Sequence, residues 1–276
     1  MMSEKLVVAA IQMGSTSDIQ RNLEMAGLLI DQAVDEGAQL VLLPENFAQI
    51  PNTKTERKQA YEDIGSGPIQ EFLSTKSQQK SIFLIAGSIA LTSDHPSKAF
   101  SASLCFDSNG NLLARYNKVH LFDVQLATGK KYAESDSFEY GELSSNDGVF
   151  STPWGIFCMT VCYDLRFPEL FRKAHDHNVI GYLVPAAFTY DTGAAHWETL
   201  LRARAIENMS FVIASNQVGE HPAGLNSWGH SMVLDPWGTI LNQQDVGEGF
   251  VLATLDTARQ RELRRDFPCL EHRRIK

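Results

Sequence analysis

The chain has 276 residues, of which 43% are hydrophobic and 21% are charged, and its formal net charge at pH 7 is −9. A chain of this size and composition can bury one large core, so we expect a single domain over residues 1–276. The acidic balance argues against nucleic acid as a partner, because binding to phosphates needs a positive face.

The first 45 residues have the pattern of strand, helix, strand. The apolar run Leu6–Ile11 predicts a buried strand, but it is too short to cross a bilayer or to serve as the apolar part of a secretory signal. We therefore expect no membrane association and a cytoplasmic location. Apolar residues at helical spacing then predict a helix from Ile19 to before Gly37. The run AQLVLLP, residues 38–44, predicts a second buried strand that stops at a proline.

Further apolar runs predict strands along the rest of the chain, and helical segments lie between several of them. The runs cover residues 81–90, 101–107, 112–119, 155–162, 179–185, 211–217, 230–236 and 250–256, and the predicted helices cover 68–79, 168–177 and 194–208. Asn109-Gly110 between two runs predicts a hairpin. There are more strands than one open sheet comfortably holds, so we expect an α/β fold in which sheets pack together under outer helices. Residues 126–147 are polar with little periodicity and predict a long loop of the kind that often serves an active site.

Three polar residues stand where buried strands end. Glu45 follows LVLLP, Lys118 ends LLARYNK and Cys162 follows GIFCMTV. The ends of strands in α/β folds are where side chains converge on a crevice. Taken singly, each has an ordinary explanation: a helix-start carboxylate, a surface lysine and a buried thiol. The four cysteines include no pair at zinc-site or disulfide spacing, which fits a reducing compartment.

Taken together, the same three residues are suited to acyl transfer. A cysteine nucleophile needs a base, and Glu45 in its apolar setting is the candidate. An ammonium near the thiol favours the thiolate and then stabilises the oxyanion of a tetrahedral intermediate, and Lys118 is suited to both tasks. The backbone N–H of Tyr163, just after the nucleophile, is a candidate second oxyanion donor.

The segments LLPEN, YNKVHLFD and VCYDLRFPEL resemble the three signature segments of the nitrilase superfamily of carbon-nitrogen hydrolases. The similarity to the branch of small amidases extends from Leu6 to about Arg274. It implies a four-layer αββα sandwich that pairs with a second subunit, and a catalytic set of glutamate, lysine and cysteine. It also implies that Glu134, in the loop after the lysine, orients the lysine and the attacking group. The mechanism implied requires no metal and no organic cofactor.

The resemblance further implies a substrate class, the terminal amide of a small 2-oxo acid, hydrolysed with release of ammonia. Residues 186–207, 226–239 and 261–274 are more similar to deaminated glutathione amidases than to ω-amidases, which act on α-ketoglutaramate. Both groups need a cation for the substrate carboxylate, and Arg166 is the candidate, since guanidinium can grip a carboxylate through two parallel hydrogen bonds. Its alternative is a salt bridge with Asp164 or Glu169. The resemblance adds Phe188 and Thr192 as pocket residues.

Other interpretations remain open at this point. A cysteine hydrolase could use a histidine base, with His196 or His230 as the partner. A metalloenzyme would draw on the run from His175 to His177. The chain could also be a binding module that keeps the fold without catalysis, although the complete set of four residues argues against this.

The C-terminal segment combines apolar and basic residues. Leu263, Phe267 and Leu270 lie among the arginines at positions 261, 264, 265, 273 and 274. We interpret the arginines as a solvated or subunit-facing surface and expect a homodimer, as the resemblance implies. The alternative is an amphipathic tail that packs on its own subunit.

Overall fold

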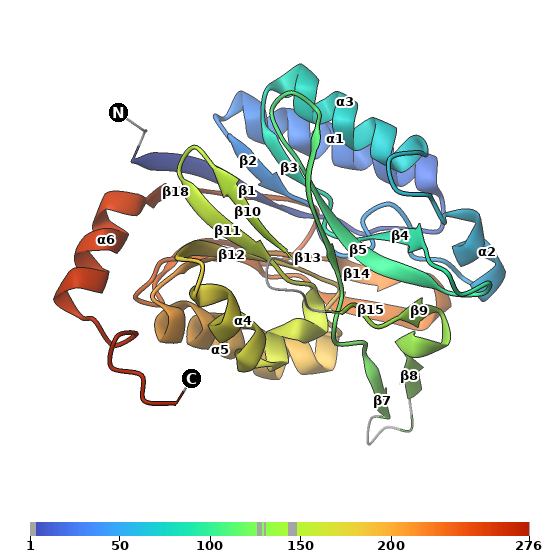
Figure 1. The fold of residues 1–276 in the computed structure, drawn as a ribbon. Coiled ribbons are helices and arrows are strands. Elements are labelled where there is room, and N and C mark those ends of the chain that lie inside the picture. The colour runs from blue at the N-terminus through green and yellow to red at the C-terminus, as the bar shows by residue number, and fades with distance from the viewer. Residues whose placement is uncertain (1–3, 126–128, 130, 143–147, 276) are drawn as a thin grey trace.

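The structure, a computed structural model, describes residues 4–125, 129, 131–142 and 148–275. Two large sheets lie face to face at its centre (Figure 1). Helices α1 (Ile19–Asp35) and α3 (Pro68–Lys80) cover the outer face of the first sheet, while α4 (Pro168–His175) and α5 (Tyr190–Asn208) cover that of the second. The four layers are helix, sheet, sheet and helix, so the predicted αββα sandwich is confirmed.

The first sheet has the strand order β18-β1-β2-β3-β5-β4, and β6 and β9 also pair with β5. Its strands are β1 (Lys5–Gln12), β2 (Leu40–Leu42), β3 (Phe83–Ile85), β4 (Ile89–Thr92), β5 (Ala99–Phe106), β6 (Leu112–Asn117), β9 (Phe138–Glu139) and β18 (Gly249–Asp256). The pairs β1–β2 and β2–β3 are parallel, which suits a sheet buried on both faces.

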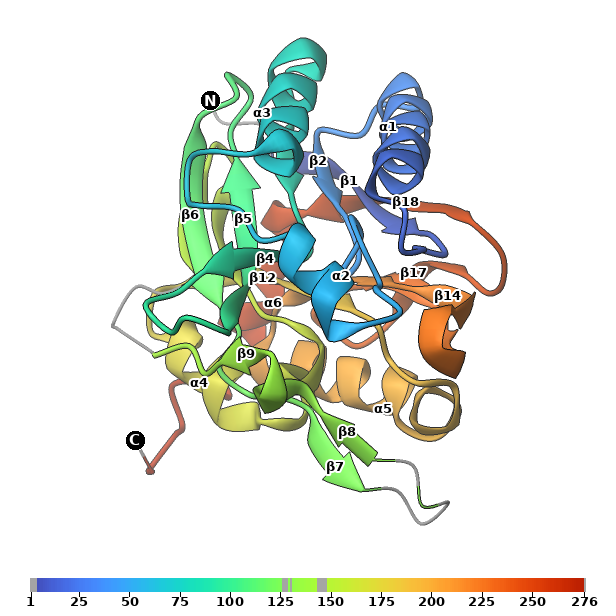
Figure 2. The same ribbon diagram turned by 90° about the vertical axis from the view of Figure 1, so that its right-hand side faces the viewer.

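The second sheet has the order β10-β11-β12-β13-β16-β17, with β11, β12 and β13 parallel. Its strands are β10 (Val149–Thr152), β11 (Gly155–Met159), β12 (Val179–Ala186), β13 (Phe211–Asn216), β16 (Ser231–Leu234) and β17 (Ile240–Gln244). Two small antiparallel pairs, β7 (Asp123–Gln125) with β8 (Lys131–Ala133) and β14 (Val218–His221) with β15 (Leu225–Trp228), complete the strands described. Figure 2 shows β7 and β8 projecting from the body of the sandwich.

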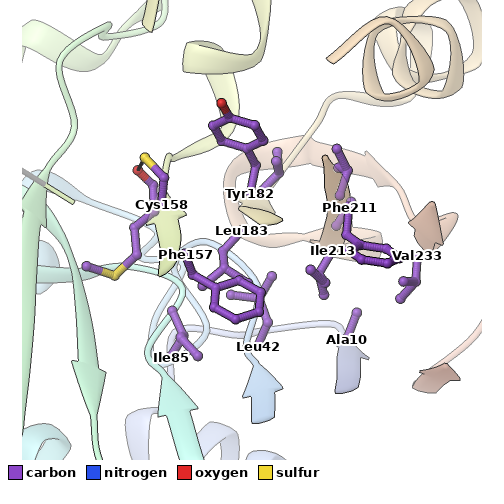
Figure 3. Packing of buried hydrophobic residues seen from close by; sticks show 14 of the residues in the cluster. Ala10, Leu42, Ile85, Phe157, Cys158, Tyr182, Leu183, Phe211, Ile213 and Val233 are labelled. Carbon is purple, nitrogen blue, oxygen red and sulfur yellow. Dashed lines mark hydrogen bonds between the residues drawn. The ribbon is translucent and has the colours of Figure 1, made fainter. Parts of the chain in front are cut away.

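The main core lies between the two sheets. Because successive side chains of a strand point to opposite faces, β1 directs Leu6, Val8 and Ala10 into this core and Ala9 and Ile11 toward the outer helices. In Figure 3 the inward residues of the first sheet lie opposite those of the second: Ala10, Leu42 and Ile85 against Phe157, Leu183 and Ile213. Because both faces of such a strand are buried, nearly all of its residues are apolar and it forms a continuous apolar run in the sequence.

The predicted elements differ from the structure in several places, among them the strand predicted at 155–162, which ends at Met159. The run at residues 81–90 forms two strands, β3 and β4, because the chain turns at Gly87, where φ is 63° and an added Cβ would lie 2.1 Å from the carbonyl oxygen of Pro44. The helix predicted at 194–208 begins four residues earlier, at Tyr190. The hairpin at Asn109-Gly110 is confirmed, since β5 and β6 pair antiparallel on either side of it.

The segment predicted as a long loop, residues 126–147, is more structured than expected where it can be described. It contains β8, the 3-10 helix η1 (Glu134–Asp136) and β9, while residues 126–128, 130 and 143–147 lie outside the described residues. Further helical segments in the described residues were not predicted: α2 (Lys54–Gln59), α6 (Thr257–Asp266) and the 3-10 helices η2 (Cys162–Arg166) and η3 (Pro222–Gly224). None of the helices in the described part of the chain has the length and apolar character to cross a membrane.

Candidate active site

Glu45 lies directly after β2 and is held from three directions. One carboxylate oxygen accepts a hydrogen bond from Lys118 Nζ at 2.7 Å, and the other accepts one from the backbone N–H of Ala187 at 2.8 Å. Its backbone carbonyl accepts a hydrogen bond from Gln217 Nε2 at 3.0 Å. The residue is 4% exposed, so its carboxylate is fixed in a buried position.

Lys118 lies at the end of β6, and its ammonium is shared between two carboxylates. Besides Glu45 it donates to both carboxylate oxygens of Glu134, at 2.8 and 2.9 Å. Burial alone would lower the pKa of Lys118, but the negative charges of Glu134 and Glu45 raise it well above its ordinary value. The side chain is therefore a permanent cation at the centre of the site.

Glu134 is the first residue of η1, which directly follows β8 in the sequence. Its carboxylate also accepts the backbone N–H of Phe122 at 2.7 Å, which anchors it to the segment that follows Lys118. Burial raises the pKa of Glu134 above its ordinary value, with Lys118 acting against this and Glu45 adding to it. The structure thus brings Glu134 to Lys118, as the resemblance implied.

Cys162 begins the 3-10 helix η2 (Cys162–Arg166), at the turn that follows β11. Its φ of 49° lies in the left-handed region, which costs an L-residue about 1–2 kcal/mol. Burial and the neighbouring Glu45 raise the pKa of the thiol well above its ordinary value, against the opposing effects of Lys118 and the Ala187 N–H. Tyr163 is the second residue of η2, and N–H groups in the first turn of a helix have no partner within it.

Asp164 ties this turn to the segment of Lys118, a role that sequence reasoning missed. It is fully buried and accepts hydrogen bonds from the Val161 N–H at 2.8 Å, the Tyr116 hydroxyl at 2.8 Å and His120 Nδ1 at 2.7 Å. A signal was present, because Asp164 and His120 each lie two residues after a predicted site residue and inside the segments that carry the resemblance.

Gln217 and Ser15 form a second supporting network that was also missed. Gln217 Nε2 donates to Ser15 Oγ at 2.7 Å as well as to the Glu45 carbonyl, and its Oε1 accepts the Ser15 N–H at 2.9 Å. Both side chains are buried. Each residue follows a buried strand, as Glu45 and Cys162 do, so the same rule applied throughout would have found them.

Glu45, Lys118, Glu134 and Cys162 all line one pocket of about 470 Å³. Its lining includes every site residue predicted from the sequence: Glu45, Lys118, Glu134, Cys162, Tyr163, Arg166, Phe188 and Thr192. In the run Thr189-Tyr190-Asp191, whose bulk and charge could narrow the pocket, only Thr189 lines it, and Tyr190 packs edge-on against Trp228 with ring centroids 4.9 Å apart.

Arg166 makes no ion pair with any residue that the structure describes, so the alternative salt bridge with Asp164 or Glu169 is not formed. Its guanidinium lies over the rings of Phe188 and Tyr163, at 5.1 and 5.9 Å from their centroids. One terminal nitrogen lies 3.3 Å from Nδ1 of His196. The side chain is available to an anion in the pocket.

The histidines considered as alternative bases lie elsewhere. Neither His196 nor His230 lines the pocket, and the ring of His230 stacks on Trp228 with centroids 4.1 Å apart. Within the described residues, no group of three or more His, Cys, Asp or Glu side chains is placed to hold a metal ion, including the run from His175 to His177.

Comparison with known proteins identifies the family. The model of the carbon-nitrogen hydrolase family matches residues 7–265. This chain belongs to the carbon-nitrogen hydrolase family. It is 39% identical over 268 residues to the deaminated glutathione amidase of Synechocystis sp., covering 97% of each chain. It is 33% identical over 282 residues to the omega-amidase NIT3 of Saccharomyces cerevisiae, covering 99% of this chain and 95% of that one.

Solved structures of this carbon-nitrogen hydrolase family share the fold. The crystal structure of Saccharomyces cerevisiae Nit3 has a TM-score of 0.88 at 30% identity and covers 99% of this chain and 98% of its own. The Caenorhabditis elegans NitFhit protein has a TM-score of 0.89 at 34% identity, with coverage of 99% of this chain and 66% of the longer one. The predicted enzyme class, an amidase, is confirmed by the family and by the amidase names of the relatives.

Proposed function

We propose that this amidase hydrolyses the amide of a small 2-oxo acid with Cys162 as nucleophile, Glu45 as base, and Lys118 as oxyanion partner. The observation that carries the proposal is the contact of one buried ammonium with a buried carboxylate, Glu45, and a partly buried one, Glu134, in the pocket that contains the thiol. Buried charges are costly unless they are paired, so such a cluster is characteristic of a functional site.

In the first half of the reaction, Cys162 attacks the amide carbonyl. Because the pKa of the thiol is raised, the proton moves to Glu45 as the C–S bond forms rather than beforehand. The negative charge that develops on the carbonyl oxygen lies between Lys118 Nζ and the Tyr163 N–H. Glu45 then returns the proton to the departing nitrogen, and a thioester remains.

In the second half, water takes the place of the departed amine. Glu45 accepts a proton from the water as the water attacks the thioester, and then passes that proton to the departing sulfur of Cys162, so that the acid and the thiol are released. Glu134 holds the ammonium of Lys118 in place through both steps by its two hydrogen bonds and its own contact with the Phe122 N–H. This sequence of steps requires no metal or organic cofactor.

We infer that deaminated glutathione is the preferred substrate. In that compound, 2-oxoglutarate is joined through its distal carboxyl group to the amine of cysteinylglycine, so the leaving group is a peptide amine. The ammonia release expected from the sequence applies instead to a primary amide such as α-ketoglutaramate, the alternative substrate. Both share one acyl group, whose carboxylate we assign to Arg166, with Phe188 as an apolar wall and Thr192 as a hydroxyl donor.

Steady-state kinetics test the substrate assignment. Deaminated glutathione is expected to have a kcat/KM at least about tenfold above that of α-ketoglutaramate, the effect of about 1.4 kcal/mol of additional transition-state binding. Equal or reversed values would move the assignment to an ω-amidase. Hydrolysis of neither compound, with other amides accepted, would leave the general amidase function alone.

Variants test the mechanism. Cys162→Ala and Glu45→Gln are each expected to lose activity by several orders of magnitude, whereas His196→Asn and His230→Asn should retain the chemical step. A Glu45→Gln enzyme with near-normal turnover would contradict the scheme. Full activity of the Cys162→Ala variant would instead indicate that the nucleophile and base lie elsewhere and that this pocket is a binding site.

We also propose a cytoplasmic homodimer. An exposed apolar patch lies outside the second sheet and is formed by Ile206, Trp237 and Phe267, which are 50%, 56% and 54% exposed. The rings of Trp237 and Phe267 are in edge contact, with centroids 5.9 Å apart. The helix α6 itself packs on its own subunit, because Arg264 donates to the carbonyls of Met209 and Val179. The patch is therefore a better candidate for the subunit contact than the arginines are.

A further inference from the structure

The pocket contains a second guanidinium that the proposed chemistry does not use. Arg57, on α2, lines the pocket and forms no ion pair with any described residue. Two other cations of the lining are paired: Lys118 with two carboxylates, and Lys54 with Asp136 at 2.9 Å. A half-buried arginine without an anionic partner is unusual, because buried charges are normally paired.

The position of Arg57 is fixed by packing. Its guanidinium carbon lies over the Phe138 ring, 5.0 Å from the ring centroid, and a guanidinium held against an aromatic face can still donate its N–H groups to an anion. Burial lowers the pKa of Arg57 below its ordinary value, and the charges of Glu134 and Glu45 partly oppose this. An arginine remains protonated nonetheless. A charged, planar donor therefore stands ready in the pocket.

The two guanidiniums without an ion pair contact different parts of the pocket lining. Arg166 lies over Tyr163 and Phe188, beside the nucleophile turn. Arg57 lies within the electrostatic reach of Glu45, the group that returns a proton to the departing nitrogen. An acyl group held by Arg166 would leave Arg57 free to bind an anionic group on the amine part of the substrate.

We propose that Arg57 binds a carboxylate on the leaving group, so that this pocket selects 2-oxo-acyl amides whose amine part is an amino acid or short peptide with a free carboxyl end. The inference rests on the proposed function. A dipeptide leaving group spans about 7 Å from its nitrogen to its carboxylate, at about 3.3–3.6 Å per residue, whereas a primary amide has no such carboxylate. Substrates would then carry one carboxylate for each guanidinium.

The alternative role for Arg57 is indirect. By its charge it could hold Glu134 or Glu45 in position, in which case its loss would affect all substrates equally. A substrate-dependent effect separates the two roles, because α-ketoglutaramate shares the acyl group but lacks the leaving-group carboxylate.

The experiment compares kcat/KM for three substrates in wild type, Arg57→Gln and Arg115→Gln. The substrates are deaminated glutathione, the same compound with its C-terminal carboxyl converted to a carboxamide, and α-ketoglutaramate. Arg115 is the matched control, since it also stacks on an aromatic ring, Phe100 at 5.5 Å, but lies outside this pocket.

Arg57→Gln is expected to lose about 10- to 100-fold for deaminated glutathione, the range for a charge-assisted hydrogen bond, and to stay within about twofold of wild type for the other two substrates. Arg115→Gln should match wild type throughout. An equal loss on all three substrates, or no loss on any, would overturn the inference while leaving the proposed function intact. If the wild type hydrolyses neither deaminated glutathione nor α-ketoglutaramate, the proposed function and this inference are both wrong.

Discussion

At the scale of single residues, the centre of the site is one ammonium shared by two carboxylates beside a thiol. Lys118 is the shared partner of Glu45 and Glu134, and the thiol of Cys162 lies in the same buried space. A thiolate would add a further negative charge there, which is why burial and Glu45 raise the pKa of Cys162. The resting nucleophile is therefore a protonated thiol, activated only when its proton can pass to Glu45.

Alkylation by iodoacetamide, read by peptide mass spectrometry, tests this environment. Cys105 and Cys158 are buried and, unlike Cys162, do not line the pocket, so no reagent reaches them and they are expected to stay unmodified in the native enzyme. Cys269 is partly exposed and should react without loss of activity. Modification of Cys162 should abolish activity and be prevented by substrate. A loss of activity that parallels the alkylation of Cys269 would contradict the assignment of Cys162 as nucleophile. A Cys162 adduct in a fully active enzyme would contradict it as well.

A pH effect on stability is expected from His221, which lines the pocket and is 6% exposed. Burial lowers its pKa below the ordinary 6.5, opposed by its contact with the Ser15 carbonyl. The unfolded chain thus takes up a proton more readily, so the stability that neutral His221 contributes is present above about pH 6.5 and lost as pH falls.

Urea unfolding at about pH 7.5 and about pH 5 measures this contribution. The midpoint should fall less for His221→Gln than for wild type over that interval, while the exposed control His272→Gln should follow wild type. If the unfolding midpoints of wild type and His221→Gln fall equally between the two pH values, His221 does not contribute to the pH dependence of stability.

At the scale of elements, the site is built from the ends of strands. The rule that polar residues after buried strands converge on a crevice predicted Glu45, Lys118 and Cys162 from the sequence, and the structure brings all three into one pocket. The rule depends only on apolar runs and their stops, which are local features. That is why the sheets, most helices and the centre of the site could be predicted.

Features set by distant contacts could not be predicted in this way. Glu134 reaches Lys118 because β7 and β8 pair across residues with no apolar pattern, and without the family resemblance it would have passed as a loop carboxylate. Helix α2, which carries Arg57, has the sequence KTERKQ and buries no residue, so it shows no periodicity from which to predict it. The break at Gly87 follows from the backbone of a neighbouring strand rather than from its own sequence.

Gly87→Ala is expected to destabilise the protein and displace Glu45. An added Cβ would lie 2.1 Å from the Pro44 carbonyl oxygen, next to Glu45, and φ is already in the left-handed region. We expect a loss of about 2 kcal/mol or more in the free energy of unfolding, and a lower kcat at temperatures where the variant is folded. Gly37→Ala is the control, because its φ is also positive but its surroundings are open. Equal effects of the two substitutions would show that close approach to Pro44 is unimportant.

At the scale of the whole molecule, the pocket is lined by segments that follow strands of both sheets, whereas the proposed subunit contact lies outside the second sheet. The apolar patch of Ile206, Trp237 and Phe267 is formed by α5, the turn after β16, and the end of α6. Helix α5 follows the segment that supplies Ala187 and Phe188 to the site. Subunit pairing through this patch would therefore stiffen the helix that begins at the pocket.

Light scattering tests the pairing. The wild type is expected at about twice the 30.7 kDa chain mass at micromolar concentration, and the double variant Trp237→Lys/Phe267→Lys near 30.7 kDa, because two charges would have to be buried in the contact. Leu28→Lys is the control, since Leu28 is 51% exposed on α1, on the opposite outer layer. A monomeric wild type, or a double variant that still pairs, would contradict a dimer through this patch.

The central claim, a thioester on Cys162, is tested most directly by partitioning with hydroxylamine. Deaminated glutathione and α-ketoglutaramate have the same acyl group and different leaving groups, so both would form one 2-oxoglutaryl enzyme. Turnover in the presence of hydroxylamine should then give the same ratio of hydroxamate to free acid from both substrates at every hydroxylamine concentration, and Cys162→Ala should give neither product. Ratios that differ between the two substrates, or product formation by Cys162→Ala, would contradict a common acyl-enzyme on this cysteine.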